Sequence, residues 1–382
     1  MKIGICLSNP PAYSETFFNS KISGLQKQGY KVALFVGNKG SKFGLCDIHY
    51  QPTFINVFAV FFKSLSSIKT IYTFSKLERK DNNSVFEIVK KIFLYNHILT
   101  SRKIDWLHFG FGTQAIGKEN IAKSIGAKMS VSFRGFDIGI YPLKHKNCYS
   151  RLWREVDKVH VISEDILVQC YNHGMKKKTL VSKITPAIDA GFFHSDTSKD
   201  FSKLNFLTVG RLHWKKGYTD TLLALGKLKE NKIPFKYTIV GTGSNPELER
   251  IKYLIYQLNI TDEVELKGKL SVKEVKKEYD KSNYYIQYST QEGFCNAVLE
   301  AQSMGLLPIV SNAEGLSENV LHTKTGWVIP KCKPELLFNS IIEISKVSKN
   351  VKNEMVVFSK KRIKENFTIE KQQKEFIEFY NI

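Results

Sequence analysis

The sequence predicts an α/β protein made of two domains, each built around a parallel sheet. The 382 residues are enough for two domains of roughly 150 to 200 residues, each with a core of its own. Short aliphatic runs alternate with amphipathic helical patterns, which is typical of a parallel sheet with helices on both faces. A polar stretch at residues 192–203 separates two series of these alternating units and is the predicted linker.

The first series predicts a domain over residues 1–192. Its strands are expected at residues 2–7, 31–36, 105–109, 128–133 and 158–162, each followed by a helical pattern. Residues 57–100 are longer than a minimal crossover between strands and almost entirely helical in pattern. This segment is therefore expected to be a set of helices.

The second series predicts a domain over residues 203–361. Its strands are expected at residues 205–209, 237–240, 263–266, 284–288 and 307–310. From residue 356 onward, apolar residues recur among charged ones with helical spacing, which predicts one long final helix.

The cysteines and the apolar segments indicate where in the cell the protein is expected. No C-x-x-C pair occurs, and no His stands near a Cys at metal-ligand spacing, so reduced thiols in the cytoplasm are expected. The apolar run at residues 3–7 is too short for the core of a signal peptide. No window of about 18 apolar residues predicts a membrane-spanning helix. We therefore expect a cytoplasmic location.

Positive charge is concentrated in the first half of the chain. The net charge is +21; residues 1–195 carry 28 Lys and Arg against 13 Asp and Glu, and the remainder carries 29 against 23. Helical segments before residue 100 interleave aromatic residues with Lys, as in Phe61-Phe62-Lys63. This composition favours binding to an anionic membrane face. Nucleic acid is the alternative partner for a basic surface, but no nucleic-acid-binding motif supports it.

Two acids stand eight positions apart in the segment from Gln291 to Gly305. The segment follows a predicted strand and opens a helical pattern, so Glu292 is expected in the loop and Glu300 about one turn inside the helix. Both carboxylates can face a ligand held at the C-terminal edge of a parallel sheet. The unpaired backbone N–H groups at the start of the helix can bind a phosphate there.

The sequence from Glu292 to Ala301, Glu-Gly-Phe-Cys-Asn-Ala-Val-Leu-Glu-Ala, resembles the signature of retaining glycosyltransferases of family 4, which have the GT-B architecture. The resemblance extends over nearly the whole chain. It implies two Rossmann-like domains whose parallel sheets face a deep interdomain cleft. It also implies that a C-terminal helix at about residues 362–382 completes the first domain, and that the helices within residues 57–100 line the acceptor side.

In that family the signature holds the donor sugar and its nucleotide. By resemblance, Glu292 binds hydroxyls of the donor sugar, and Glu300 binds the ribose hydroxyls, which suits a carboxylate because it can accept from two neighbouring hydroxyls. The backbone that is expected to approach the sugar and phosphate belongs to Gly293, Phe294, Cys295 and Asn296.

A basic loop, Gly210-Arg211-Leu212-His213-Trp214-Lys215-Lys216-Gly217, follows the first strand of the second series. A nucleotide-sugar donor leaves as a diphosphate whose negative charge grows as the glycosidic bond breaks, so a cation must meet it. Arg211 offers a planar fork for phosphate oxygens and Lys216 a point charge, so together they can replace a metal ion. No convincing D-x-D motif stands at a strand end, and no metal site is expected. The loop resembles the family's G-R-x(n)-K-G element, in which the following glycine favours Lys216 over Lys215.

Two further loops follow strands of the second series. Gly241 and Gly243 lie in Val240-Gly241-Thr242-Gly243-Ser244, and Lys267 and Gly268 follow the next predicted strand. A G-x-G pattern alone is weak evidence for a binding loop. By resemblance to the family, the first loop lies beneath the donor nucleotide and the second flanks the base.

A motif near the start, Pro11-Ala12-Tyr13-Ser14-Glu15-Thr16-Phe17, resembles the P-x-x-S-E-T-F element of family members that build bacterial surface polysaccharides. The resemblance implies that Ser14, Glu15 and Thr16 lie near the donor or acceptor sugar. Helix capping is the alternative explanation for Ser14 and Glu15, and both interpretations stay open.

The sequence Ser132-Phe133-Arg134-Gly135-Phe136-Asp137 resembles the family's H-G-x-D element, with Arg134 where the family has His. By resemblance, Arg134 and Asp137 belong to the sugar pocket. Arg cannot accept a proton at neutral pH, so this position either hydrogen-bonds the sugar or marks a changed donor preference or lost activity. His108 ends another strand and is a further pocket candidate, with a structural His bonded to the backbone as the alternative.

The activity that the resemblance implies is retaining, metal-independent transfer of a sugar from a UDP- or GDP-linked donor to a growing glycan of a bacterial surface polysaccharide, without a cofactor. The acceptor is expected to carry a polyprenyl diphosphate, and the enzyme to be peripheral on the inner face of the plasma membrane. A sugar-nucleotide 2-epimerase of similar architecture is the alternative enzyme. A membrane-docked scaffold without catalytic activity is the alternative outside enzymes.

Overall fold

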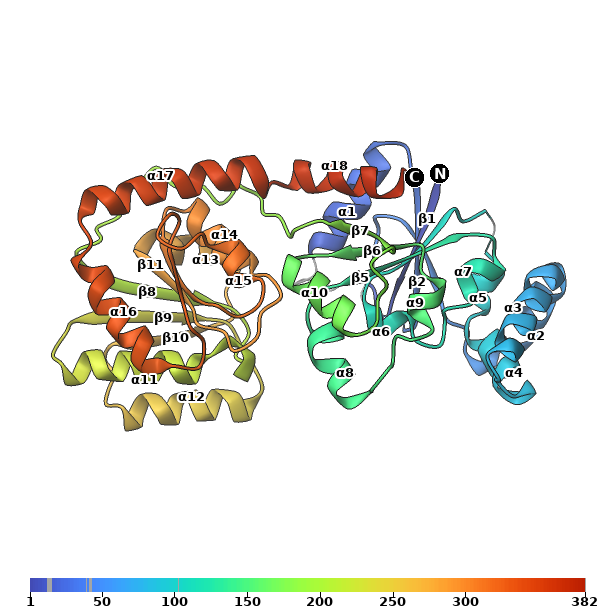
Figure 1. Ribbon diagram of the computed structural model, residues 1–382, viewed down its shortest axis with the longest axis horizontal. Helices are drawn as coiled ribbons and strands as arrows, with labels where there is room; N and C mark the ends of the chain where they lie inside the picture. Colours follow the sequence, from blue (N-terminus) through green and yellow to red (C-terminus); the bar gives the residue numbers. More distant parts are fainter. Residues whose placement is uncertain (12–15, 39, 41–42, 102, 382) are drawn as a thin grey trace. The chain divides into compact units, whose positions relative to one another are not determined.

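The computed structural model describes residues 1–381 except residues 12–15, 39, 41–42 and 102, and the chain divides into two compact units (Figure 1). Unit 1 comprises Met1–Ile184 with Gln372–Ile382, and unit 2 comprises Thr185–Lys371. Each unit holds one sheet of its own. The division between the units thus lies before the predicted linker at residues 192–203, and the chain returns to unit 1 at residue 372.

Unit 1 is built on a seven-stranded sheet of order β3-β2-β1-β4-β5-β6-β7, in which every neighbouring pair is parallel. Its inner strands are apolar on both faces, as expected for a sheet with helices on two sides. In β1, for example, Lys2 is half-buried and every residue after it is buried. The strands are β1 (Lys2–Leu7), β2 (Lys31–Val36), β3 (Asp47–Tyr50), β4 (Trp106–Phe109), β5 (Lys128–Phe133), β6 (Lys158–Val161) and β7 (Leu180–Lys183).

The helices of unit 1 include a group that stands beside the sheet, between β3 and β4 in the sequence (Figure 1). This group confirms the helical character expected for residues 57–100. The helical elements of unit 1 are α1 (Thr16–Lys27), η1 (Phe54–Asn56), α2 (Val57–Ser66), α3 (Ile68–Lys80), α4 (Val85–Leu94), α5 (Asn96–Leu99), α6 (Gly112–Ala115), α7 (Ile121–Ser124), the π-helical turn η2 (Phe136–Ile140), α8 (Tyr141–Lys144), α9 (Leu152–Glu155) and α10 (Glu164–Asn172).

Unit 2 is built on a six-stranded parallel sheet of order β10-β9-β8-β11-β12-β13. The strands are β8 (Leu204–Val209), β9 (Phe235–Val240), β10 (Val264–Gly268), β11 (Tyr284–Gln287), β12 (Leu307–Ser311) and β13 (Trp327–Ile329). The helical elements are η3 (Trp214–Lys216), α11 (Tyr218–Glu230), α12 (Asn245–Gln257), α13 (Val272–Lys281), α14 (Asn296–Ser303), α15 (Leu316–Asn319), α16 (Pro334–Lys346) and α17 (Lys349–Asn366). Because all strands are parallel, their carboxyl ends and the loops that follow them share one edge of the sheet.

The end of the chain forms two helices, so the prediction of one long final helix is wrong. After α17, the backbone of Phe367 and Thr368 leaves helical geometry and pairs with Ile188, whose N–H donates to Phe367 O at 3.0 Å. The chain then continues as α18 (Ile369–Tyr380), whose Phe376 and Tyr380 are buried in the core of unit 1. The part of α18 from Gln372 onward therefore belongs to unit 1.

Three short strands were not predicted from the sequence: β3, β7 and β13. Each lies at an edge of its sheet, and β3 and β7 have no buried residue, so neither carries the apolar run that marks an inner strand. Within the described residues, no single helix is long and apolar enough to span a membrane, although the pair Phe54–Ser66 and Ile68–Lys80, bent by 94°, meets the same criteria of length and composition together.

Candidate active site

The loop after β8 is fixed by close backbone packing against the loop after β9. The N–H of Leu212 donates to Thr242 O at 2.9 Å. A β-carbon on Gly241 would lie 1.9 Å from Gly210 O, and one on Gly243 would lie 2.1 Å from Leu212 O. Only glycine fits at these two positions, so the predicted glycine loop supports the basic loop from below.

Gly217 fixes the far end of the basic loop. Its φ of 68° is left-handed, and a β-carbon there would lie 1.8 Å from Tyr288 O, at the end of β11. The N–H of Thr290 donates to Lys215 O at 2.8 Å. The loops after β8 and β11 therefore interlock through their backbones.

The interlocked loops bring together Lys216 and Glu292, which are 76 positions apart. Lys216 Nζ donates to Glu292 Oε2 in an ion pair, and the two side chains are only 20% and 14% exposed. Burial alone would lower the pKa of Lys216, but attraction and hydrogen bonding from the Glu292 carboxylate outweigh burial and raise that pKa above its ordinary value. Lys216 is therefore a cation at neutral pH.

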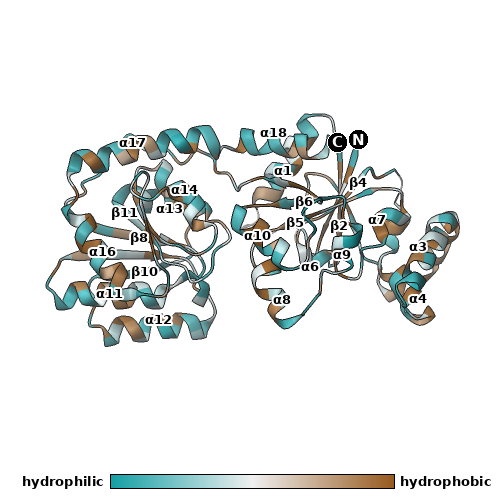
Figure 2. Ribbon diagram, in the orientation of Figure 1, coloured by the Kyte–Doolittle hydropathy of each residue, from teal (hydrophilic) through white to brown (hydrophobic). Residues whose placement is uncertain are grey.

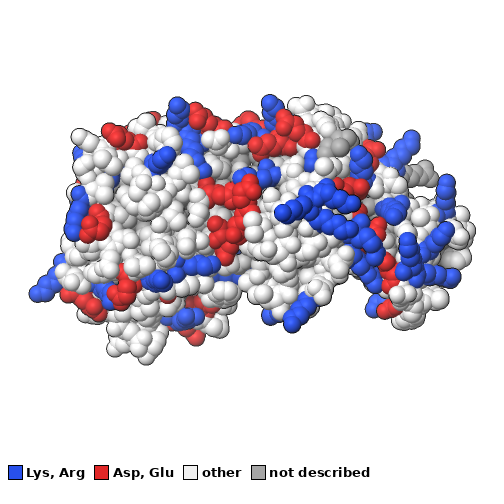
Figure 3. All heavy atoms as spheres, in the orientation of Figure 1, with Lys and Arg blue, Asp and Glu red and all other residues white. Residues whose placement is uncertain are grey.

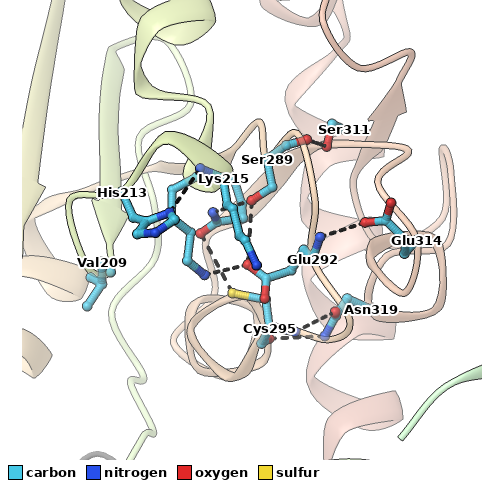
Figure 4. A network of polar contacts seen from close by, with 12 residues as sticks. Val209, His213, Lys215, Ser289, Glu292, Cys295, Ser311, Glu314 and Asn319 are labelled. Carbon is cyan, nitrogen blue, oxygen red and sulfur yellow. Dashed lines mark hydrogen bonds and ion pairs between the residues drawn. The ribbon is translucent and has the colours of Figure 1, made fainter. Parts of the chain in front are cut away.

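The backbone of Glu292 is anchored by residues of the loop that follows β12 (Figure 4). The N–H of Glu292 donates to Glu314 Oε2 at 2.7 Å, and the N–H of Gly315 donates to Glu292 O at 3.0 Å. Lys331 Nζ lies 3.0 Å from Glu314 Oε1 and balances its charge. Glu314 is a left-handed residue with φ 35°, a conformation that the sequence does not signal.

Residues 293–296, which lead into α14, are held by a second anchor (Figure 4). The N–H of Cys295 donates to Asn319 Oδ1 at 3.0 Å, and Asn319 Nδ2 donates to Cys295 O at 3.1 Å. Gly293, Phe294 and Cys295 are buried, whereas Asn296 at the start of α14 is partly exposed. Burial raises the pKa of the Cys295 thiol to about 11, so the thiol is neutral at physiological pH.

Glu300 lies inside α14 and has a neutral partner. The Tyr279 hydroxyl donates to Glu300 Oε2 at 2.9 Å. Burial raises the pKa of Glu300 to about 7, and the hydrogen bond from Tyr279 opposes this rise only in part. Lys216, Glu292 and Glu300 all perturb the pKa of Cys295. The charges of one predicted cation and both predicted acids therefore reach the same buried thiol.

Arg211 stands beside this cluster on the exposed side of the basic loop. Its positive charge opposes, in small part, the rise in the pKa of Lys216, so the two cations lie within electrostatic range of each other. Arg211 is exposed, as a group that meets a ligand from solvent must be.

Lys267 and Gly268 end β10. Lys267 Nζ lies 3.2 Å from Glu265 and 3.4 Å from Glu278, so its side chain is held by acids of its own unit. The carbonyl of Gly268 accepts from Gly241 N–H at 2.8 Å, and this bond joins the loops after β9 and β10. Because the Lys267 side chain is held by these acids, the backbone of this segment is the part that can contact the base of a donor nucleotide.

Arg134 and Asp137 lie at the end of β5 in unit 1 and line a cavity of about 360 Å³. Asp137 Oδ1 accepts from Arg134 N–H (3.0 Å) and Gly135 N–H (2.9 Å), and Oδ2 accepts from Gly112 N–H (3.0 Å). The guanidinium carbon of Arg134 lies 3.7 Å from the centre of the Phe17 ring, a cation–π contact. The carboxylate of Asp137 therefore builds the turn, and Arg134 supplies the charge of the cavity.

His108 does not line this cavity, which corrects its assignment as a pocket residue. The ring is completely buried: the hydroxyls of Ser130 and Tyr380 lie 2.8 Å from Nδ1, and the hydroxyl of Ser132 lies 2.8 Å from Nε2. Lys21 Nζ lies 3.2 Å from the same Nε2. Burial holds the pKa of His108 well below its ordinary value. It is a structural His whose partners are side chains rather than backbone.

The remaining candidates carry less information. Ser14 and Glu15 lie outside the described residues, and Thr16 is the first residue of α1. Among the described residues, no group of three or more His, Cys, Asp or Glu side chains is placed to hold a metal ion.

A cavity of about 1050 Å³ in unit 1 is lined by Asp105 and Lys128, at the amino ends of the strands. Ligands of parallel sheets bind at the carboxyl ends, so this cavity is not a candidate.

A family model described as glycosyl transferases group 1 matches residues 192–362, the part of the chain that contains Lys216, Glu292 and Glu300. The whole chain is also similar to the putative colanic acid biosynthesis glycosyltransferase WcaL of Escherichia coli, with 25% identity over 396 residues and 96% of each chain covered. Residues 192–362 therefore form a group 1 glycosyltransferase domain, and this protein is a glycosyltransferase.

Solved structures share the fold of the whole glycosyltransferase. A glycosyltransferase from Rickettsia africae superposes with a TM-score of 0.71 at 18% identity, covering 99% of this chain and 97% of the other. Anabaena HepE, solved in complex with UDP and glucose, superposes with a TM-score of 0.72 at 14% identity, covering 99% and 98%. The predicted GT-B class, two Rossmann-like units with parallel sheets, is confirmed.

Proposed function

We propose that this glycosyltransferase moves a sugar from a UDP- or GDP-linked donor to a growing glycan of a bacterial surface polysaccharide, with retention of configuration and without a metal ion. The Escherichia coli relative is named for colanic acid biosynthesis, and the Anabaena neighbour was solved with UDP and glucose; both support this choice of substrates. The observation that carries the proposal is the ion pair of Lys216 and Glu292 between the loops after β8 and β11.

In the proposed reaction, the bond between the anomeric carbon and the leaving phosphate oxygen breaks while the bond to the acceptor oxygen forms on the same face of the sugar. The proton of the acceptor hydroxyl passes to an oxygen of the leaving phosphate. Lys216 and Arg211 offset the negative charge that grows on the diphosphate, as a metal ion does in other transferases. Glu292, released by Lys216, accepts hydrogen bonds from the donor sugar.

Glu300 has the role of a ribose ligand in this proposal. Its carboxyl group already accepts from the Tyr279 hydroxyl at 2.9 Å, and its raised pKa leaves it partly protonated near neutral pH. Two ribose hydroxyls that donate to Glu300 favour the ionised form, so donor binding is expected to release a proton over this pH range. The backbone N–H groups at the start of α14 are assigned to the phosphates in this proposal.

The proposed acceptor is linked to a polyprenyl diphosphate, and the enzyme acts as a peripheral protein at the cytoplasmic face of the plasma membrane. The excess of 28 Lys and Arg over 13 Asp and Glu in residues 1–195 supports this location. Figure 3 shows such cations clustered on the visible face of unit 1. Near an anionic leaflet each cation contributes about 1 kcal/mol of attraction.

The test is nucleotide release from a panel of UDP- and GDP-sugars, with and without an extract of lipid-linked acceptors. The proposal predicts release that depends on the acceptor and favours one donor. A 2-epimerase would interconvert sugar nucleotides without acceptor, and a scaffold would release nothing from any donor. A thermal-shift screen of the same donors selects the base independently, because a bound donor stabilises the folded state.

A further inference from the structure

Residues 54–89 of unit 1 expose large apolar side chains in one region. Phe54, Ile55 and Phe58 are 89%, 93% and 80% exposed, and Phe86 is 78% exposed. Soluble proteins rarely leave so many large apolar side chains in contact with water without a partner. The exposed faces of η1, α2, α3 and α4 are called the helical patch below.

On α2 four large exposed apolar side chains form one stripe. Phe58, Phe61, Phe62 and Leu65 recur at helical spacing on one side, whereas Val60 on the opposite side is buried. This is the pattern of a helix with two apolar faces, one for the protein and one for a partner.

The helices α3 and α4 repeat this division. Ile68 and Tyr72 share an exposed face of α3 and are 67% and 69% exposed, while Phe74 of the same helix is completely buried. On α4, Phe86 is exposed and Ile88 is buried. Figure 2 shows hydrophobic residues interspersed with hydrophilic ones along α3 and α4.

The inner sides of these helices already hold the group together. Asn96 Nδ2 donates to Ser64 Oγ at 2.8 Å, which ties α5 to α2. Lys91 Nζ lies 2.7 Å from the buried Glu78, which ties α4 to α3. These polar contacts lie on the inner sides of the helices, so the aromatic side chains that stay exposed on the outer side are available to a partner.

Cations accompany the apolar stripe. Residues 54–94 contain seven Lys and Arg against three Asp and Glu. Lys69 and Lys76 are exposed on α3 one turn or less from the face of Tyr72, and Lys90 is exposed on α4 next to the face of Phe86. Figure 3 shows cationic side chains beside the uncharged surface in this part of unit 1.

We propose that the helical patch is the surface by which the enzyme docks on an anionic lipid membrane. The aromatic side chains enter the boundary between headgroups and acyl chains, and the lysines reach the anionic headgroups with their apolar stems along the same face. This inference deepens the proposed function and takes the membrane as partner from it. A second copy of the chain fits the patch less well, because it would bring the lysines of both copies together in a desolvated interface.

The test is partition of the full chain onto vesicles of 70% phosphatidylcholine and 30% phosphatidylglycerol, measured by flotation. The wild type is expected to float with these vesicles and to remain at least half bound in 0.5 M NaCl, because apolar insertion is not screened. Phe58→Ser with Phe62→Ser is expected to weaken partition at least tenfold. Tyr256→Ser with Phe358→Ser is the matched control, since these exposed residues of unit 2 are 75% and 45% exposed, and it is expected to bind as the wild type does.

Three results would overturn the proposal: wild-type partition by the Phe58→Ser, Phe62→Ser variant, complete loss of wild-type binding in 0.5 M NaCl, or a wild-type dimer that does not float. Melting temperatures of both double variants should match the wild type, since the changed side chains are exposed. Sugar transfer is measured separately with a detergent-dispersed acceptor extract, which needs no docking. Vesicle binding without transfer from any donor would refute the proposed function and leave the docking surface intact.

Discussion

The strand-end loops of the two units use charged side chains in different ways. In unit 2, Lys216 and Glu292 pair side chain to side chain across two interlocked loops. In unit 1, the Asp137 carboxylate accepts from three backbone N–H groups. A pair of side chains can separate when a ligand arrives, whereas a carboxylate bonded to backbone is part of the fold. Charged side chains at the ends of parallel strands are therefore expected to serve ligand binding in unit 2 and the stability of the fold in unit 1.

The largest expected effect is on transfer. Lys216→Ala and Glu292→Ala are each expected to slow nucleotide release at least 100-fold, or about 2.7 kcal/mol of transition-state stabilisation, because each removes a group that meets the donor. Melting temperatures should stay close to that of the wild type. Lys215→Ala, the neighbouring cation, is the control and is expected to change the rate less than fivefold. A rate within threefold of wild type for either variant would reject its assigned role.

In unit 1, Asp137→Ala is expected to reduce the stability of the fold. Removing the carboxylate leaves three backbone N–H groups of a buried turn without their acceptor, so the free energy of unfolding is expected to fall by about 2 kcal/mol. Thermal or urea unfolding measures this loss. Glu292→Ala is the control, since removing that carboxylate is expected to leave the free energy of unfolding close to that of the wild type. Normal melting of Asp137→Ala with loss of transfer would place Asp137 among the sugar contacts and break the contrast.

A pair of glycines sharpens the account of the interlocked loops. Gly217 and Gly268 have nearly equal φ values of 68° and 65°, but a β-carbon meets Tyr288 O at 1.8 Å in the first case and nothing within 4 Å in the second. Gly268→Ala is expected to cost about 1 kcal/mol from backbone strain alone, and Gly217→Ala about 2 kcal/mol more. Equal losses of unfolding free energy would mean that the loops do not interlock as described.

The pH dependence tests the environment of Glu300. Its folded pKa of about 7 lies above the ordinary value of 4.5, so the folded state holds the proton more tightly than the unfolded state. The contribution of Glu300 to stability is therefore greatest below about pH 4.5 and falls as pH rises towards 7. Relative to Glu300→Gln, the wild type is expected to lose on the order of 2 kcal/mol of unfolding free energy between pH 5 and pH 8. A constant difference between the two would contradict the buried position of this carboxyl.

The smallest expected effect is that of a chelator. If Arg211 and Lys216 replace a metal ion at the diphosphate, nucleotide release should be unchanged in EDTA after extensive dialysis. A metal-dependent transferase measured in the same buffer shows that the chelation is effective. Loss of release that Mg²⁺ or Mn²⁺ restores would show that the two cations do not suffice.

Much of the fold follows from the sequence because inner parallel strands carry long apolar runs. Residues 128–133 were predicted as a strand, and β5 has the same bounds. The edge strand β7, with exposed Leu180 and Lys183, has no such run and was missed. The break between α17 and α18 was also missed, because it depends on pairing of Thr368 with the distant Ile188.

Those parts of the site that lie within one short sequence motif can be predicted from the sequence. Lys216 and Glu292 each belong to such a motif, and the parallel topology brings the ends of their two strands to one edge of the sheet. The anchors of Glu292 were not predictable, because Glu314 acts through a left-handed backbone conformation and Lys331 lies beyond another strand. His108 was misplaced for a related reason: its partner Tyr380 comes from the far end of the chain.

The most direct test of the central claim is a double-mutant cycle of Lys216→Ala and Glu292→Ala, read as acceptor-dependent nucleotide release. If the two residues act as one unit on the donor, the double variant should be no more than about tenfold slower than the slower single variant. Losses that multiply fully, or a single variant that keeps near wild-type release, would contradict the account.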